Sequence, residues 1–506
     1  MCADPYTTLG DEYVGHDEPS VLFKSDVPGS GNDITYVMTL PKDPNARPSA
    51  SGAGGGTWNF QLRPTFWFGL TLCDTESAPE FTKTCTPDSD ANNLVGTDPS
   101  AADYIGKHPG NAFMELQFYG PGYVPQFEGF GCTATQYCAA MTIDSLTLDQ
   151  NHGTGTGTPN NPDCSNYILG GTEPINWAYI TKDGVSQAPA NPLFTGTFDA
   201  PNLSAVNPNP QKDLFMNPGD RIRIHMHDTA AGFQTDLFDL TTGQSGSMTA
   251  SIANGFGHIL YEPDASECHV APYAFHPMYD TAVARGTTWG AHTTNVGVSD
   301  EIGHFEYCDA INAAAQCTDP GGADTEVDVD DQVCLDGADF DALIPLKGCL
   351  LDDGDFDGVS YQREWPGTLR NRGQDRKLHG TPVQFTVPST HGRTLEQVAF
   401  ETDLPRIERG EPGNPNPQCD ALTGAHCVNP PPGSAFYPIY TSTKRHGDCY
   451  LQQGGPLLKP TRNTFGGTSA TEYGTEVLFV TYPDVGFQTI TLAEDFRRAL
   501  DRSACS

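Results

Sequence analysis

The sequence predicts a mostly β protein built from two or more β-sandwich domains, and composition, length and residue alternation each support this. The chain has 506 residues with 54 glycines and 41 prolines, while charged residues make up only 18%. This composition favours many short strands joined by structured turns over long helices. A chain of this length holds roughly two to four domains, each able to bury its own core.

Alternating apolar residues predict the individual strands. In TWNFQLRPTFWFGLTLC, residues 58–62 alternate with polar neighbours, and the alternation resumes over 66–72 after a proline. AFMELQFYGPG repeats the pattern over 114–118, and INWAYITKDGVS, from 175 to 186, ends a strand with a Lys-Asp-Gly turn. Period-two alternation is typical of strands that bury one face.

One segment, TLAEDFRRALDRS at 491–503, predicts a helix instead. Thr491 stands where an N-cap is expected, and Leu492, Phe496 and Leu500 are spaced to share one helical face.

Two shifts in composition predict the domain boundaries. NHGTGTGTPNNPD, residues 151–163, has no apolar residue, and TDPGGADTEVDVDDQ after Cys317 is acidic and rich in turn formers. We therefore expect boundaries near 165 and 320. They divide the chain into an N-terminal β-sandwich over 1–165, a histidine-rich β-sandwich over 166–320 and an aspartate-rich C-terminal β region over 321–506.

The charge balance excludes one class of partner. With 64 acidic and 27 basic residues the formal net charge is -37, and such a surface repels phosphate backbones, so nucleic acid is not an expected partner. Excess carboxylate serves solubility, and it also suits a chain that meets divalent cations. No run of 18 apolar residues occurs, so no transmembrane segment is expected.

Cysteine usage predicts an extracellular protein. Fifteen cysteines without repeated CxxC pairs indicate disulfide bonds in an oxidising compartment. The first residues lack the basic and apolar regions of a signal peptide, so we interpret the sequence as a mature secreted chain. An odd count leaves at least one cysteine unpaired within the chain, and Cys2 is the candidate: free, bonded to another chain, or lipidated for cell-surface attachment. Proximity suggests four pairs: Cys73–Cys85, Cys132–Cys138, Cys308–Cys317 and Cys334–Cys349.

The sharpest local motif predicts a calcium site. DGDFDGVSYQRE, residues 353–364, matches the loop D-x-D-x-D-G with glutamate at the twelfth position. In this template the expected ligands are the carboxylates of Asp353, Asp355 and Asp357, the carbonyl of Val359 and the carboxylate of Glu364. No paired amphipathic helices flank the loop, so we expect a structural calcium site; an aspartate-rich turn that binds nothing is the alternative.

Histidines suggest a second metal site. Seven of the fourteen lie between 225 and 304. In RIRIHMHD, residues 221–228, apolar residues alternate with Arg221, Arg223, His225 and His227, so both histidines project from the face opposite the apolar one. They either share a metal or continue a solvated strand face.

The middle of the chain also resembles a cupredoxin domain. NPGDRIRIHMHDT is similar to the G-D-x-V-x-V strand of such β-sandwiches, and EIGHFEYC to their closing G-x-F-x-Y-x-C strand, with the cysteine one position early. This resemblance implies a cupredoxin-like fold for the middle domain. After Cys308 the chain DAINAAAQC offers neither histidine nor methionine, so a type 1 copper centre is not expected and Cys308 is better interpreted as half of a disulfide.

Over nearly its whole length the chain resembles a group of uncharacterised secreted bacterial and fungal proteins. The resemblance rests on FWFGLTLCDT, FMELQFYGPG, LTTGQSGSMTASIANGFG, PYAFHPMYDT, SDEIGHFEYC, DFDGVSYQREWPGT, AFETDLPRIE and NTFGGTSA. It implies secretion and family membership but no activity.

Three functions then compete. The first is a secreted copper or zinc protein, with a copper-dependent oxidoreductase as its catalytic form and His227, His276, His292, His304 and a spare His225 as ligands. The second is a calcium-braced, disulfide-rich surface or matrix protein without catalysis, which self-associates or contacts extracellular matrix. The third is a hydrolase in which His227 with Asp228, or His304 with Glu306, acts as base and orienting group.

Overall fold

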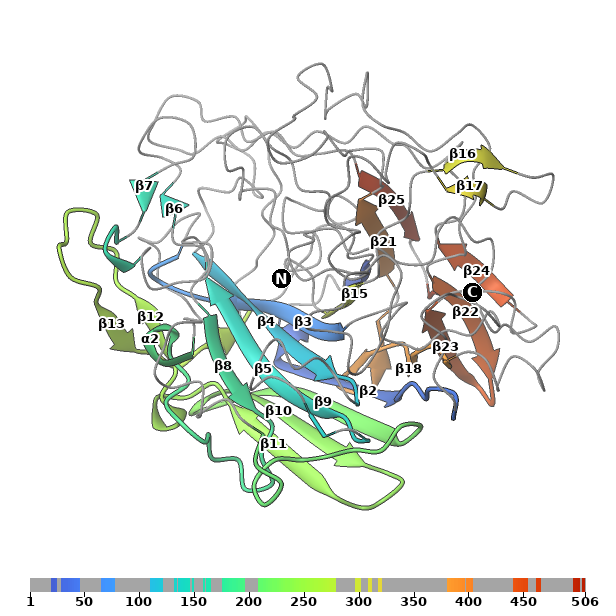
Figure 1. Ribbon diagram of the computed structural model, residues 1–506, viewed down its shortest axis with the longest axis horizontal. Coiled ribbons are helices and arrows are strands. Elements are labelled where there is room, and N and C mark those ends of the chain that lie inside the picture. Colours follow the sequence, from blue (N-terminus) through green and yellow to red (C-terminus); the bar gives the residue numbers. More distant parts are fainter. Residues whose placement is uncertain are drawn as a thin grey trace.

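The computed structural model of the chain is mostly β. It describes residues 20–24, 29–45, 65–77, 110–121, 132–133, 135–145, 148–149, 158–159, 161–164, 175–195, 208–278, 296–301, 308–311, 317–320, 380–395, 397–403, 440–453, 461–465, 495–500 and 503–505. The helical elements described are short: α2 (Pro192–Thr195), η1 (Ser30–Asn32) and η6 (Ile252–Asn254). All strand pairs described are antiparallel, and most belong to two large sheets (Figure 1).

The first large sheet has nine strands in the order β25-β21-β1-β15-β3-β4-β5-β8, with β14 also pairing β3. Their bounds are β1 Ser20–Lys24, β3 Thr65–Cys73, β4 Asn111–Tyr119, β5 Cys138–Ser145, β8 Ile175–Tyr179, β14 His276–Pro277, β15 Val296–Glu301, β21 Gln397–Asp403 and β25 Asp495–Leu500.

The second large sheet has ten strands in the order β11-β10-β9-β2-β18-β23-β22-β24, with β19 pairing β2 and β20 pairing β19. Their bounds are β2 Asp33–Thr39, β9 Arg221–Thr229, β10 Gly232–Asp239, β11 Ser245–Thr249, β18 Gln384–Thr386, β19 Ser389–Thr390, β20 Arg393–Thr394, β22 Tyr440–Arg445, β23 Asp448–Gln453 and β24 Thr461–Phe465.

Three small sheets complete the described structure. Each has two strands: β6 (Leu148–Asp149) with β7 (Thr158–Pro159), β12 (Gly257–Ile259) with β13 (Val270–Pro272), and β16 (Cys308–Ile311) with β17 (Cys317–Pro320).

The two large sheets pack face to face around one core, which makes a β-sandwich (Figure 1). The ring of Phe68 on β3 lies 4.7 Å from that of Tyr36 on β2 and 5.6 Å from that of Phe385 on β18. Phe23 on β1 meets Phe385 edge to face at 6.4 Å. These contacts cross from one sheet to the other, so the aromatic side chains anchor the sandwich.

The strands expected over 66–72 and 114–118 are confirmed as β3 and β4, whose alternate residues enter this core. The strand expected from 175 is β8, and the turn after it contains Gly184 with a φ of 72°. A positive φ suits glycine, which explains the Lys-Asp-Gly sequence. The strand expected over 58–62 lies outside the described residues.

The helix expected over 491–503 is wrong where the structure describes it. Residues 495–500 form β25, which pairs antiparallel with β21 in the register Phe400↔Arg498. Phe496 and Leu500 sit four residues apart, a spacing that a strand also places on one face. Pairing with an open sheet edge therefore overrides the local helical pattern.

Strands from all three predicted domains contribute to each large sheet. The nine-stranded sheet takes β3 from the segment 1–165, β15 from 166–320 and β21 from 321–506, and the ten-stranded sheet likewise joins β2, β9 and β23. The three segments thus share both large sheets. A separate cupredoxin-like middle domain and calcium bracing of the C-terminal region stay predictions.

Disulfide bonds are present, as the cysteine content predicted. Cys132–Cys138 is confirmed. Two bonds join more distant cysteines, Cys164–Cys268 and Cys449–Cys505. Cys73 is also disulfide-bonded, and the pairing Cys73–Cys85 stays a prediction. Cys308 and Cys317 begin the paired strands β16 and β17, and their bond stays a prediction, while Cys334, Cys349 and Cys2 lie outside the described residues.

Candidate metal centre

Strand β9 presents the two histidines of RIRIHMHD on the outer face of the sandwich. Ile222, Ile224 and Met226 are fully buried in the core, while His225 and His227 are partly exposed. The alternation predicted from the sequence is therefore confirmed. Because β9 lies between β2 and β10, both histidines have neighbours on either side.

A tight hairpin brings β10 back along β9. Thr229 pairs with Gly232 around two intervening residues, and the Thr229 hydroxyl donates a hydrogen bond to the Gly232 carbonyl at 2.6 Å. Gly232 has a φ of 134°, and a Cβ there would lie 2.3 Å from the Ala250 carbonyl, so only glycine fits. This register places Asp236 directly opposite His225.

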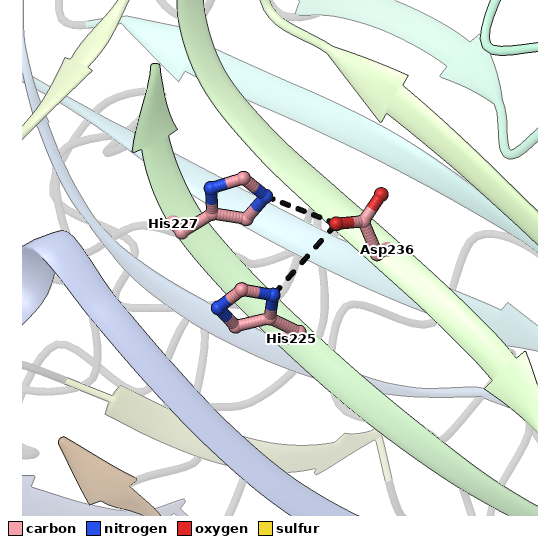
Figure 2. Close-up of side chains that lie close together, drawn as sticks. All are labelled: His225, His227 and Asp236. Carbon is pink, nitrogen blue, oxygen red and sulfur yellow. Dashed lines mark hydrogen bonds and ion pairs between the residues drawn. The ribbon is translucent and has the colours of Figure 1, made fainter. Parts of the chain in front are cut away.

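His225, His227 and Asp236 form a compact group of nitrogen and oxygen donors (Figure 2). One oxygen of Asp236, Oδ2, lies 2.9 Å from His227 Nε2 and 3.8 Å from His225 Nδ1. The two imidazole rings are stacked in parallel, with centroids 4.2 Å apart and planes 8° apart. Their ligand atoms all lie within 4.8 Å of one another, so a single ion can reach all three after small rotations.

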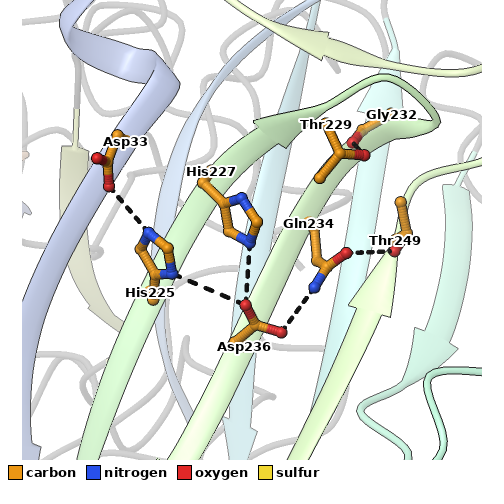
Figure 3. Close-up of polar contacts among 8 residues, drawn as sticks. All are labelled: Asp33, His225, His227, Thr229, Gly232, Gln234, Asp236 and Thr249. Atoms are coloured by element: carbon orange, nitrogen blue, oxygen red, sulfur yellow. Dashed lines mark hydrogen bonds and ion pairs between the residues drawn. The ribbon is translucent and has the colours of Figure 1, made fainter.

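Neighbouring residues orient two of the three side chains, His225 and Asp236 (Figure 3). His225 Nε2 lies 2.9 Å from an oxygen of Asp33 on β2. The side-chain amide nitrogen of Gln234 donates a hydrogen bond to the second oxygen of Asp236 at 2.8 Å. The side-chain oxygen of Gln234 in turn accepts one from the Thr249 hydroxyl at 3.1 Å. Each contact fixes one donor group, as the outer hydrogen bonds around protein metal sites do.

The chemistry of this set suits a transition metal. Two imidazole nitrogens and one carboxylate oxygen are the protein ligands that catalytic zinc sites use, with a fourth position left open. Imidazole also binds Cu(II) well. The side chains of His225, His227 and Asp236 are 36%, 23% and 37% exposed, so an ion and a further ligand can reach them from solvent.

Of the other predicted histidine ligands, only His276 lies within the described residues, and it does not belong to this group. His276, on β14, directs Nδ1 to an oxygen of Asp228 at 2.8 Å. Because β9 continues through Thr229, adjacent residues point to opposite faces, so Asp228 lies away from His227. Asp228 therefore orients His276, and the proposed His227–Asp228 catalytic pair does not form. His292 and His304 lie outside the described residues, and so does Glu306.

The predicted calcium loop also lies outside the described residues. This applies to all five of its expected ligands: Asp353, Asp355, Asp357, Val359 and Glu364. Calcium binding at 353–364 stays a prediction.

Two carboxylates of the centre, Asp236 and Asp33, were missed by the sequence analysis. A signal for Asp236 exists, because a two-residue turn after Thr229 pairs residue 236 with 225 and puts both on one face. No comparable signal exists for Asp33, which is 192 residues from His225 in the sequence.

Another imidazole–carboxylate pair, His258 with Asp74, is buried. His258 directs Nδ1 to Asp74 at 2.8 Å and stacks on Tyr273 with ring centroids 4.2 Å apart. Burial raises the pKa of Asp74, but hydrogen bonds and charge from His258 outweigh it, so this pKa lies below its usual value. Asp74 is 1% exposed, and its second oxygen accepts a hydrogen bond from the Ser77 hydroxyl, so the carboxylate joins the turn after β3 to His258 on β12.

Comparison with known proteins assigns no family to this arrangement. The chain matches no family model, no curated protein and no solved structure. None of the helices in the described part of the chain has the length and apolar character needed to cross a membrane.

Proposed function

We propose that this protein is an extracellular metal-binding protein that holds zinc or Cu(II) through His225, His227 and Asp236. The observation that carries the proposal is the convergence of His225 Nδ1 and His227 Nε2 on one oxygen of Asp236, at 3.8 and 2.9 Å. Disulfide bonds support an extracellular location.

A set of ordinary ion pairs is the competing explanation. Partly exposed histidine–carboxylate pairs contribute little to stability, typically below about 1 kcal/mol. Stacked parallel imidazoles repel each other when both are protonated, and both would face the same carboxylate oxygen. A divalent ion between them satisfies both nitrogens at once and replaces the protons, which is why we favour metal binding.

Titration calorimetry tests the proposal. The metal-free full chain, titrated with ZnCl2 at pH 7.5, is expected to bind one ion at the histidine centre. His227→Ala and Asp236→Asn are each expected to weaken this binding at least about 100-fold, more than the 10–100-fold cost of losing an outer hydrogen-bond partner. Equal zinc affinity in wild type and both variants contradicts the proposal.

His276→Ala is the matched control, because His276 is also a partly exposed imidazole paired with an aspartate. It is expected to change zinc affinity less than twofold. A large loss in this variant would favour the ligand set first expected from the sequence over His225, His227 and Asp236.

Copper-dependent oxidoreductase activity is the catalytic extension of this proposal. The Cu(II)-loaded chain is expected to show an EPR spectrum with nitrogen coupling from two imidazoles, and the signal should vanish with ascorbate and return in air. If copper binds but is not reduced by ascorbate and reoxidised in air, the protein is a copper-binding protein without redox catalysis. Absence of any zinc or copper binding favours the calcium-braced matrix protein.

A further inference from the structure

Arg223 stands beside the candidate metal centre on the same face of β9. It precedes His225 by two residues, so both side chains project from the outer face. Its guanidinium carbon lies 5.1 Å from the centroid of the Phe238 ring, and Phe238 is its partner in the β9–β10 register. On the β2 side it pairs with Val37. An aromatic ring and an aliphatic residue thus flank the cation.

The guanidinium has no carboxylate to neutralise it within the described structure. No ion pair of Arg223 occurs among the described residues, although the chain has 64 acidic and only 27 basic residues. On the outer face of the facing strand, the acidic residue closest in register is Asp236, which is already engaged by His227 and Gln234. Stacking on Phe238 orients the cation and leaves its N–H groups free to bind another anion.

The strand spacing between Arg223 and His225 is comparable to the span of one bridging oxyanion. Residues two apart on a strand are separated by about 6.6–6.8 Å along the same face. A metal–oxygen bond of about 2.1 Å and a guanidinium hydrogen bond of about 2.8 Å cover about 5 Å of this distance. Two oxygens of one carboxylate or phosphate close the remaining gap, with one oxygen on the metal and the other on Arg223.

We infer that the outer face of β9 and β10 binds a small oxyanion, a carboxylate or a phosphate, between the metal ion and Arg223. This inference rests on the proposed function, because it needs the ion at His225, His227 and Asp236. The open coordination position takes one oxygen, and the planar guanidinium takes the other. The ligand of this centre is therefore an anion. The metal ion and Arg223 attract it, although the net charge of the chain is strongly negative.

Cobalt-loaded full chain tests the inference, because the visible spectrum of bound Co(II) responds to a new oxygen ligand. Titration with sodium acetate and, separately, with inorganic phosphate is expected to change the spectrum saturably. Arg223→Gln is expected to weaken the binding of both anions at least about tenfold while metal affinity changes less than twofold. Arg223→Lys should fall between wild type and Arg223→Gln, since it keeps the charge and loses the planar fork.

Arg221→Gln is the matched control, since Arg221 lies on the same face but two residues further from the histidines. It is expected to leave anion binding within twofold of wild type. Equal losses in both glutamine variants, or a cobalt spectrum that does not respond to either anion, overturns the inference while leaving metal binding intact. Failure to bind cobalt or zinc at all instead refutes the proposed function.

Discussion

At the scale of single residues, the contact between Asp33 and His225 has the clearest consequence for the centre. Asp33 faces Nε2 of His225, while Nδ1 faces Asp236. A carboxylate that accepts the Nε2 proton leaves the lone pair on Nδ1, the nitrogen directed toward the proposed ion. Asp33 is thus a positioning residue that sets the tautomer of a ligand.

Asp33→Ala is expected to weaken zinc binding about 10–100-fold without abolishing it, because it removes this orienting contact and no ligand. Asp33→Asn should recover part of the loss, since its amide oxygen still accepts a hydrogen bond. Calorimetric zinc titration of the two variants measures both effects. Zinc affinity unchanged in Asp33→Ala argues against a positioning role.

His391 contacts the other oxygen of Asp33 at 3.4 Å and provides a control for this experiment. It is 63% exposed and has a φ of 46°, followed by Gly392. His391→Asn introduces a residue that tolerates this positive φ. It should alter zinc affinity less than about threefold, because an exposed ion pair contributes little to holding Asp33 in place. His446→Asn is matched to it, since His446 has a φ of 53° and also precedes a glycine.

At the scale of elements, a buried aspartate joins the loops around β8. Asp213 accepts hydrogen bonds from the Gln187 side chain and the Asn209 backbone, and its backbone forms a bridge with Thr181. Burial raises the pKa of Asp213 to about 6, against the opposing effect of these hydrogen bonds and nearby lysines. The loops are therefore held together by the carboxyl group of Asp213, which ionises less readily than an exposed aspartate.

Because the folded state holds the Asp213 proton more tightly than the unfolded state, its ionisation destabilises the fold. Between pH about 4 and about 6 the folded state binds more protons than the unfolded state. The free energy of unfolding therefore falls as pH rises through this range and stays lower above it. Asp213→Asn should remove this fall, on the order of 1–3 kcal/mol, when urea unfolding is measured from pH 4 to 7. Identical pH slopes in both proteins contradict the assignment.

At the scale of the whole molecule, Phe68 links the two sheets. It packs against Phe66 and Phe118 within its own sheet and against Tyr36 and Phe385 of the other. Phe68→Ala is expected to lower the free energy of unfolding by about 3–5 kcal/mol, because a large cavity opens between the sheets. Urea unfolding followed by circular dichroism measures this loss.

Phe194→Ala is the control for that measurement, since Phe194 is 36% exposed on α2. Phe194→Ala should change the free energy of unfolding by no more than about 0.5 kcal/mol, as surface substitutions do. Similar losses in both variants would show that Phe68 does not join the sheets.

The sequence by itself determined what depends on neighbouring residues in the chain. Alternation placed β3, β4 and β9 correctly and put His225 and His227 on one polar face, because successive strand residues must point to opposite sides of the pleat. Cys132–Cys138, only six residues apart, was predicted for the same local reason.

Only the tertiary structure decided which strands lie side by side, and this choice completed the centre. Asp33 comes to His225 because β2 pairs with β9 across almost two hundred residues, and residues 495–500 become a strand because β21 offers a partner. Local pattern cannot encode such pairings, since each strand edge can accept many partners and burial of the common core selects among them.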